Sequence, residues 1–304
     1  MIVNRFQPTV KIMILRILAL ILLLLIIPSY ANEKSQLIIK DFFDTVVNWS
    51  TMQISLNASE KLPRVIIDVD DPEYGKENTA YNISEARNKS LLTAKEKTKI
   101  HFVRSIESIR LNEEYTIIEK VNKDEKFRER FNEFFLNESS EIKVKYIQDE
   151  VRVESLTKLL GSKGLMNYLM INYDTEKFPE FMEIPVPEAY TGLIIDARHL
   201  DANPALFPRI FTDKGLEIYS MSLVNKNFAI DNGFVIYMSD PIKAMKHQRV
   251  GENPYLVVAT NVIGKNKTGY TIPTKEATKI LATKETKKNL KKCKVIIVLR
   301  RQLS

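Results

Sequence analysis

Cysteine is almost absent from this chain of 304 residues, in which Cys293 is the only one. A single thiol excludes an internal disulfide and a cysteine-based metal cluster. Cys293 stands between lysines at the head of the apolar run Val295–Leu299. We therefore expect its side chain to be buried as a small hydrophobic group.

Histidine is nearly as scarce, and recognisable catalytic motifs are missing. His101, His199 and His247 are far apart in the sequence, so a histidine metal site would have to be assembled across the fold. The chain has no nucleophile elbow and no pair of acids at a defined spacing. We therefore predict no catalytic residue, no cofactor and no metal ion for this protein.

One acidic segment, Asp68–Glu73, invites a calcium interpretation because hard cations bind several oxygen ligands. Pro72 stands at its fifth position, and the glycine and final glutamate of a helix-loop-helix calcium site are misplaced. We interpret the segment as a solvated acidic loop.

Glycine is scarce in the first half of the chain, where Gly75 alone precedes Gly161. Because glycine marks tight turns, we expect long elements in residues 32–180 and short strands joined by turns in residues 181–304. Helix is disfavoured at the boundary between these two regions by the prolines at positions 179, 185 and 187.

The start of the chain has the pattern of a secretory signal. Residues 1–31 combine basic residues, an unbroken apolar run from Ile17 to Ile27 and a small residue, Ala31, at the predicted cleavage site. The run is shorter than the roughly 20 residues of a membrane-spanning helix. We predict a cleaved signal peptide, with an uncleaved anchor as the alternative, and the translation start is either Met1 or Met13.

The expected location is the periplasm or the outer cell envelope of a bacterium. A secreted eukaryotic protein of this size would commonly contain several disulfides. No cysteine follows the cleavage site in the first part of the mature chain, which excludes the lipid-modified cysteine of bacterial lipoproteins.

The charge of the mature chain does not indicate a nucleic-acid partner. Loss of Arg5, Lys11 and Arg16 with the leader takes the 45 basic residues to 42, against 38 acidic ones, a net charge of +4. Charges of both signs alternate, whereas nucleic-acid binders cluster basic residues on one face. The lysine-rich stretch 275–294 leaves peripheral contact with an anionic membrane open, although glutamates within it favour a solvated helix face.

Hydrophobic periodicity predicts a strand and two helices in the first region. Residues 44–56 alternate apolar and polar side chains toward their end, as a strand does. After Ser84, apolar or small residues recur at helical spacing for about 25 residues. A second, phenylalanine-rich helix is expected from Lys126 to Leu136, and a turn at Gly161–Gly164.

Short strands and helices alternate in the second region. Asp213–Gly215 predicts a hairpin, and Asp240-Pro241 predicts the start of a helix. One lysine-rich helix is expected from Thr274, as its N-cap, to about Lys288. Strands are expected at 192–197, 234–238, 256–262, 270–272 and 295–299.

This mixture favours an α+β fold over a doubly wound parallel sheet. We predict an N-terminal strand and long amphipathic helix region, followed by a mixed α+β domain with hairpins that ends in a helix and a strand.

The most enzyme-like group is the loop containing Asp196, Arg198 and His199, at the end of an apolar strand. Active sites are common at such strand ends, and a carboxylate beside a histidine can orient it as a general base. The structural alternative, which we favour, is an Asp196–Arg198 pair that holds the loop.

A family resemblance is carried by residues 187–198 (PEAYTGLIIDAR) and 204–210 (PALFPRI), and more weakly by 253–259 and 293–298. These segments resemble exported envelope proteins of spirochaetes and proteobacteria related to the small flagellum-associated lipoproteins and the flagellar-assembly H-ring and T-ring proteins. The chain departs from that family at His199, where a glycine is common, and in lacking the lipid-anchor cysteine.

The resemblance implies a non-enzymatic envelope protein that scaffolds or stabilises a larger structure, such as the flagellar base. Its partners would be envelope or flagellar basal-structure proteins, with a homo-oligomer also open. Two alternatives remain: a periplasmic enzyme using Asp196 and His199, and a surface adhesin or ligand-binding protein.

Overall fold

The structure is a computed structural model that describes residues 35–40, 45–63, 80–137, 140–170, 175–181 and 187–301. The predicted signal peptide, residues 1–31, and the acidic segment Asp68–Glu73 lie outside the described residues. Residues Leu37–Ser304 form one compact unit. Helices and strands occur together and antiparallel hairpins accompany a parallel sheet, which confirms the predicted α+β class.

The first region is built on a five-stranded antiparallel sheet in the order β1-β2-β3-β5-β4. Its strands are β1 (Ile38–Lys40), β2 (Thr45–Asn48), β3 (Gln53–Lys61), β4 (Glu141–Ile147) and β5 (Glu150–Lys158). Alternate residues of β3 are buried on one face, and their partners across the β3–β5 pairing are buried on the same face. Strand periodicity therefore gives this sheet one apolar face.

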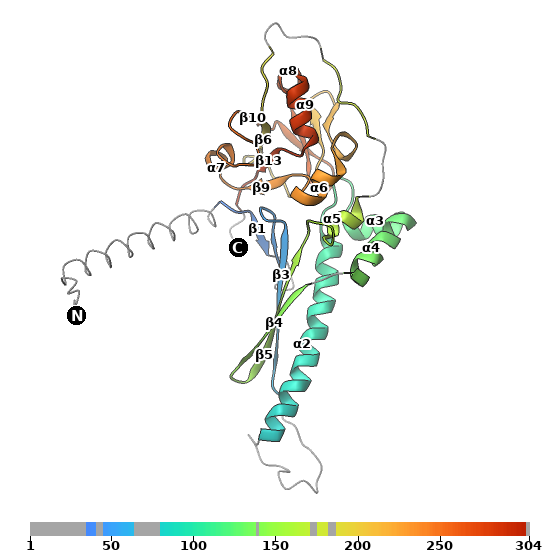
Figure 1. Cartoon of the computed structure of the whole chain (residues 1–304), viewed down its shortest axis with the longest axis vertical. Coiled ribbons are helices and arrows are strands. Elements are labelled where there is room, and N and C mark those ends of the chain that lie inside the picture. The colour runs from blue at the N-terminus through green and yellow to red at the C-terminus, as the bar shows by residue number, and fades with distance from the viewer. Residues whose placement is uncertain are drawn as a thin grey trace, which may run out of the picture. The chain divides into compact units, whose positions relative to one another are not determined.

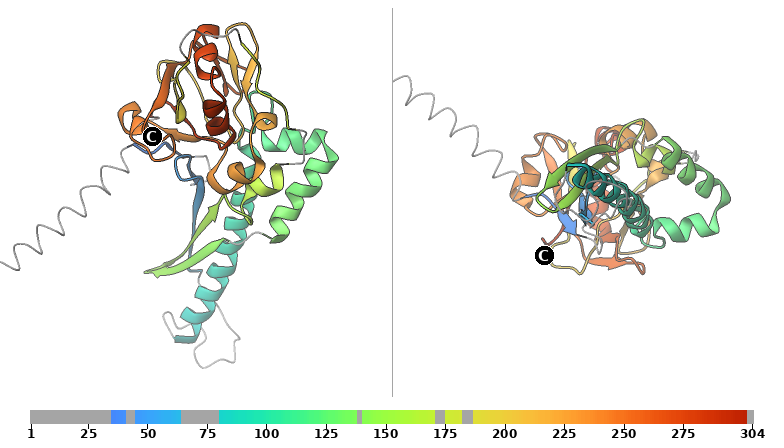
Figure 2. Two further views of the ribbon diagram at one scale, coloured as in Figure 1. Left: turned by 45° about the horizontal axis from the view of Figure 1, so that its top comes forward. Right: turned by 90° about the horizontal axis from the view of Figure 1, so that it is seen from below.

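The long helix α2 (Ala80–Ser108) packs on that face, as Figures 1 and 2 show. Its buried side chains recur every four residues and are small along much of the helix: Ala86, Ser90, Ala94 and Thr98. Small side chains let the helix lie close to the strands, and the Ser90 hydroxyl donates to the Lys61 carbonyl at 2.9 Å. The helix predicted after Ser84 is confirmed and has 29 residues.

Three shorter helices complete this region: α3 (Ile117–Lys123), α4 (Glu125–Asn137) and α5 (Leu165–Leu169). The phenylalanine-rich helix is confirmed as α4, which buries Phe127, Phe131 and Phe134. Helix α3 was not predicted from the sequence, and its N-terminus is closed by a capping box between Thr116 and Glu119.

A four-stranded parallel sheet in the order β10-β6-β13-β9 forms the centre of the second region. Its strands are β6 (Gly192–Asp196), β9 (Ile236–Met238), β10 (Pro254–Val258) and β13 (Val295–Val298). Leu193 and Ile195 face the main core, whereas Ile194 and Ile296 pack in a second cluster with Ala244. Burial on both faces is typical of parallel sheets.

A smaller sheet, in the order β11-β12-β7-β8, lies in the same region. Its strands are β7 (Ile210–Thr212), β8 (Glu217–Tyr219), β11 (Asn261–Ile263) and β12 (Gly269–Ile272). The hairpin predicted at Asp213–Gly215 is confirmed, with Gly215 at a φ of 79°. The single strand predicted at 256–262 is wrong, because the chain leaves the parallel sheet after β10 and enters the smaller sheet as β11.

The remaining helical elements are η1 (Met221–Leu223), α6 (Lys226–Asn232), α7 (Pro241–Met245), α8 (Thr274–Ile280) and α9 (Lys284–Lys291). Asp240 caps α7 as predicted. The single helix predicted from Thr274 is wrong: Thr274 is the first residue of α8, and Thr283 caps a separate helix by accepting from the Thr286 N–H at 3.2 Å. A threonine side chain that bonds the backbone in this way starts a new helix.

Cys293 is buried as predicted, and burial raises the pKa of its thiol to about 11. Within the described ranges, no helix combines the length and apolarity needed to cross a bilayer.

Candidate functional site

The predicted loop begins at Asp196, the last residue of β6, an inner strand flanked by β10 and β13. Since the four strands are parallel, their carboxyl ends lie along one edge of the sheet, where ligands commonly bind in such sheets. Asp240, just after β9, lies at the same edge and adds a favourable charge interaction to Arg198. The loop is therefore at a position where chemistry is plausible on topology alone.

The Asp196 carboxylate is held by Arg198 in a two-pronged ion pair. Arg198 Nε donates to Asp196 Oδ1 at 2.9 Å, and Nη2 donates to Oδ2 at 2.7 Å. The Arg198 backbone N–H donates to the same Oδ1 at 3.2 Å. These bonds hold the pKa of the Asp196 carboxyl below its usual range and raise the pKa of Arg198. A carboxylate with both oxygens engaged and a lowered pKa is a weak base.

His199 is exposed beside this pair. The hydrogen bonds found for the Asp196 carboxylate, among the residues described, all come from Arg198 and none from His199. The carboxylate is therefore not placed to orient the imidazole as a base. In the described part of the chain, no group of three or more His, Cys, Asp and Glu side chains is arranged to hold a metal ion.

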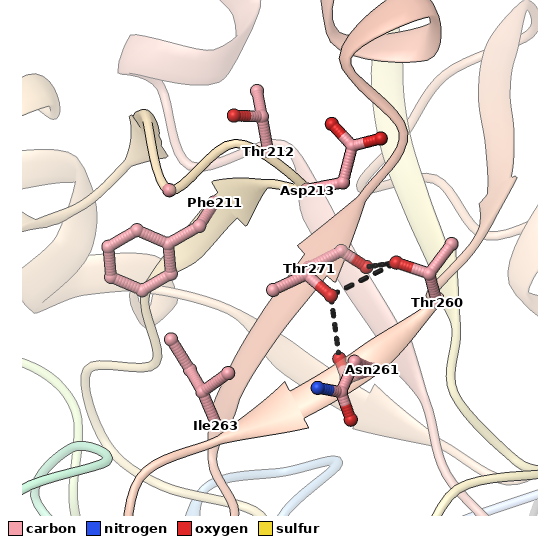
Figure 3. Close-up of a pocket in the computed structure, with 8 residues that line it drawn as sticks. Phe211, Thr212, Asp213, Thr260, Asn261, Ile263 and Thr271 are labelled. Carbon is pink, nitrogen blue, oxygen red and sulfur yellow. Dashed lines mark hydrogen bonds between the residues drawn. The ribbon is translucent and has the colours of Figure 1, made fainter.

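A hollow of about 460 Å³ opens over the smaller sheet, between β7, β11 and β12. Figure 3 shows Phe211 and Ile263 on one side of it and a cluster of polar groups on the other. The Thr260 and Thr271 hydroxyls bond each other at 3.0 Å, and the Thr271 hydroxyl also donates to the Asn261 carbonyl at 3.3 Å. Because these polar groups bond one another, they support the strand pairing.

Asp213, at the rim of the same hollow, is also engaged. Its carboxylate accepts from the Thr274 N–H at 3.0 Å and from the Thr274 hydroxyl. The hydroxyl bond is the main cause that lowers the pKa of Asp213. This contact joins the β7–β8 turn to the start of α8. The Asp213 carboxylate therefore has a structural role that requires no ligand.

A second hollow, of about 550 Å³, was not anticipated from the sequence. It contains Arg249, His247, Lys292 and Lys294. Arg249 and His247 follow α7, whereas the two lysines precede β13 nearly fifty residues later, so no local motif joins them. Only the packing of β9 beside β13 brings these segments together.

The edge strand β4 is the other feature that the sequence analysis missed. All seven of its residues are exposed, including Ile142, Val144 and Tyr146. A strand that exposes apolar side chains at the edge of a sheet is a potential docking surface.

A comparison with protein-family models gives a match for the second region. Residues 192–301 match the family model described as Treponema pallidum Tp0624, second domain. The match starts at the first residue of β6 and ends after β13, so it covers both sheets of the second region. Curated proteins gave no match. The second region is thus similar to a spirochaetal domain, and the flagellar part of the resemblance stays a prediction.

Proposed function

We propose that this protein is an exported, non-enzymatic protein that acts in the cell envelope as a structural or assembly factor through protein–protein contact. The edge strand β4 is the observation that carries the proposal. The leader sequence supports export, and the similarity of residues 192–301 to a spirochaetal domain supports a bacterial setting.

The apolar face of β4 continues the face that α2 covers. Ile142, Val144 and Tyr146 lie opposite three β5 residues that are buried, namely Ser155, Val153 and Val151. Directly paired residues of an antiparallel sheet point to the same face. Yet Ile142 is 55% exposed and Tyr146 51% exposed, because α2 packs over β3 and β5 and reaches β4 through Arg87, whose guanidinium carbon lies 5.5 Å from the centre of the Tyr146 ring.

The outer backbone edge of β4 adds main-chain donors and acceptors to this surface. In the described sheet, β5 is the one neighbour of β4. An extended segment of a partner can add itself as a further strand, gaining main-chain hydrogen bonds and burying alternate side chains. The three apolar residues of β4 would supply the specificity of such a contact.

The charges on β4 favour a different protein over a second copy of this chain as the partner. Lys143 and Lys145 alternate with the apolar residues, and Lys145 is also paired with Glu154 of β5 at 2.5 Å. Antiparallel pairing of two β4 strands about Val144, the centre of the strand, would set Lys143 directly opposite Lys145 of the other copy at two places. Like charges directly opposite destabilise a strand pair. We therefore propose an extended segment in which apolar residues alternate with acidic ones.

The narrower proposal, a role at the flagellar base, rests only on the family resemblance, which residues 187–210 carry most clearly. It names the class of partner to look for, since ring and basal-body proteins assemble through repeated protein contacts. The more general proposal does not depend on it.

The test is a photo-activated cross-linker at Val144 in the full-length protein in its native cells. We expect an adduct with a different envelope protein. The double substitution Ile142→Lys and Tyr146→Lys should abolish the adduct. Both side chains are half exposed, and Tyr146→Lys also removes the contact with Arg87, so the unfolding free energy should fall by no more than about 1 kcal/mol.

The matched control is Ile242→Lys, on the exposed surface of α7, where the wild-type side chain is 69% exposed. It should leave the adduct intact. An adduct that survives the double substitution, or none at all, would contradict the docking role of β4. An adduct between two copies of this chain would show that β4 mediates a homo-oligomer and would contradict the proposal of a different protein as the partner.

A further inference from the structure

The hollow around Arg249 combines uncompensated positive charge with apolar walls. It lies where the turn after β2 and Leu160, two residues after β5, meet the amino ends of β9 and β13. Arg249, Lys292 and Lys294 contribute the charge, and Phe228 and Ile236 contribute apolar surface. Among the described residues that line it, there is no aspartate or glutamate. This contrasts with the alternating charges along the rest of the chain.

Arg249 is fixed in place by backbone carbonyls instead of by a carboxylate. Its guanidinium donates from Nε to Val295 at 3.0 Å, from Nη1 to Asn232 at 2.5 Å and from Nη2 to Gly233 at 2.6 Å. Burial lowers the pKa of this guanidinium from its usual value. An arginine has five N–H donors, so two remain after these three bonds. The carbonyl bonds orient the group while leaving its charge unneutralised.

Lys292 and Lys294 bring two more cations to the same hollow. They flank Cys293, whose backbone takes a left-handed φ of 58° at the turn from α9 into β13. Lys292 Nζ lies 5.7 Å from the ring centre of Phe228, and no ion pair to either lysine occurs among the described residues. Two lysines without an ion pair in the described structure therefore line the same hollow as the fixed guanidinium.

His247 adds a neutral donor to this group. Its Nδ1 accepts the Arg249 backbone N–H at 3.1 Å, which leaves the Nε2 position to carry the proton. Burial, reinforced by the Arg249 charge, lowers the pKa of His247. The imidazole thus stays neutral near pH 7 and can donate one hydrogen bond.

We propose that this hollow is a binding site for a phosphorylated organic anion. Three cations with no facing carboxylate match a phosphate group, which carries about −1.5 to −2 charge at pH 7, better than a single carboxylate. A volume of about 550 Å³ is far larger than a phosphate ion needs and is in the range of small-molecule sites. The walls formed by Phe228 and Ile236 would contact an apolar or ring-shaped body attached to the phosphate.

The proposal is tested by calorimetric titration of the mature protein with three probes: inorganic phosphate, phenyl phosphate and benzoate. We expect phenyl phosphate to bind about tenfold more tightly than either of the others, since only it offers both the dianion and the ring. Sedimentation with phosphatidylglycerol and phosphatidylcholine vesicles distinguishes a lipid headgroup from a free phosphorylated molecule as the source.

The double substitution Lys292→Gln and Lys294→Gln should weaken phenyl phosphate at least tenfold while the protein remains folded, because neither lysine makes an ion pair in the described structure. Arg249 is unsuitable for the first test because its carbonyl bonds support the fold. The matched control is Lys287→Gln with Lys288→Gln, which removes the same charge from α9 outside the hollow.

Unchanged affinity in the Lys292 and Lys294 variant, or an equal loss in the control, would overturn the proposal. Failure of all three probes and of both vesicle types at millimolar phosphate would overturn it as well. None of these results bears on the β4 surface, because the hollow and the edge strand are built from different residues.

Discussion

Asp196 is the residue whose environment gives the sharpest expectation about stability. The Arg198 side chain engages both of its carboxylate oxygens, and the Asp196 side chain is 13% exposed. The resulting ion pair closes the loop that follows β6. Separately, the Arg198 backbone carbonyl accepts from Arg300 Nε at 3.2 Å, which connects this loop to the residues after β13.

We expect Asp196→Asn to lower the unfolding free energy by about 1 kcal/mol at pH 7, since part of the pair is solvent-exposed. The pKa of Asp196 is lowered by folding, so the stabilisation is complete above its ordinary value of 3.8 and is lost as the pH falls through the folded-state pKa. The difference between wild type and variant should therefore shrink below about pH 4. Urea unfolding at pH 7 and pH 3 measures it.

His199→Ala is the control for this experiment, because the exposed imidazole makes no hydrogen bond to Asp196 in the described structure. Its stability should match the wild type at both pH values. An enzyme centred on Asp196 and His199 would lose its function on either substitution, whereas the envelope role proposed above should survive both. A constant stability difference from pH 7 to pH 3 would contradict the ion-pair explanation.

At the scale of elements, α2 shows how side-chain size sets the distance between a helix and a sheet. The buried positions 86, 90, 94 and 98 hold alanine, serine or threonine, and the helix then turns to larger buried groups at Phe102 and Ile106. Close approach at the small residues also permits the bond between Ser105 and Thr45, at 2.8 Å.

We expect Ala94→Leu to lower the unfolding free energy by about 1–3 kcal/mol, because Ala94 is fully buried and extra methyl groups would push α2 away from the strands. Leu92→Ala, two residues earlier on the exposed side of the same helix, should change it by less than about 0.5 kcal/mol. Both values come from urea unfolding. Equal effects of the two substitutions would show that the small buried residues of α2 do not set the distance between this helix and the sheet.

Elements with a strong local pattern were predictable, and elements defined by their neighbours were not. The periodicity after Ser84 and the phenylalanines of α4 are repeated within one segment, so one reading of the sequence finds them. β4 alternates charged and apolar residues, which is the pattern of a strand, so the strand itself was predictable; that no helix covers its apolar face was not, because this depends on where α2 packs. At the break between α8 and α9, the Thr283 hydroxyl accepts a hydrogen bond from the Thr286 N–H. The spacing of apolar residues along a helix does not predict such a cap.

At the scale of the whole molecule, one core joins the two regions of the chain. The main cluster of buried residues runs from Leu37 in the first region to Leu299 after the last strand. Trp49, in the turn between β2 and β3, packs edge-on against Tyr237 of β9 with ring centres 5.6 Å apart. The hollow around Arg249 lies at this junction, so an anion bound there would contact both regions.

Export is the prediction that concerns the chain as a whole. We expect the mature protein isolated from the envelope fraction to begin at Asn32, after loss of residues 1–31. Mass spectrometry of the intact chain measures this. A charge in the apolar run, as in Leu23→Arg, should leave the full-length chain in the cytoplasm. Untrimmed wild-type protein recovered from the cell interior would contradict export.

The sequence by itself determined the α+β class, the long helix, the hairpin at Asp213–Gly215 and the burial of Cys293, because each depends on residues close together in the chain. Only the tertiary structure decided that β6, β9, β10 and β13 run parallel and that Arg249 lines the same hollow as Lys292 and Lys294. These features depend on segments far apart in sequence or on the direction in which a side chain points. The interactions that stabilise them form only when the packed core brings the groups together. A local pattern of residues therefore does not reveal them.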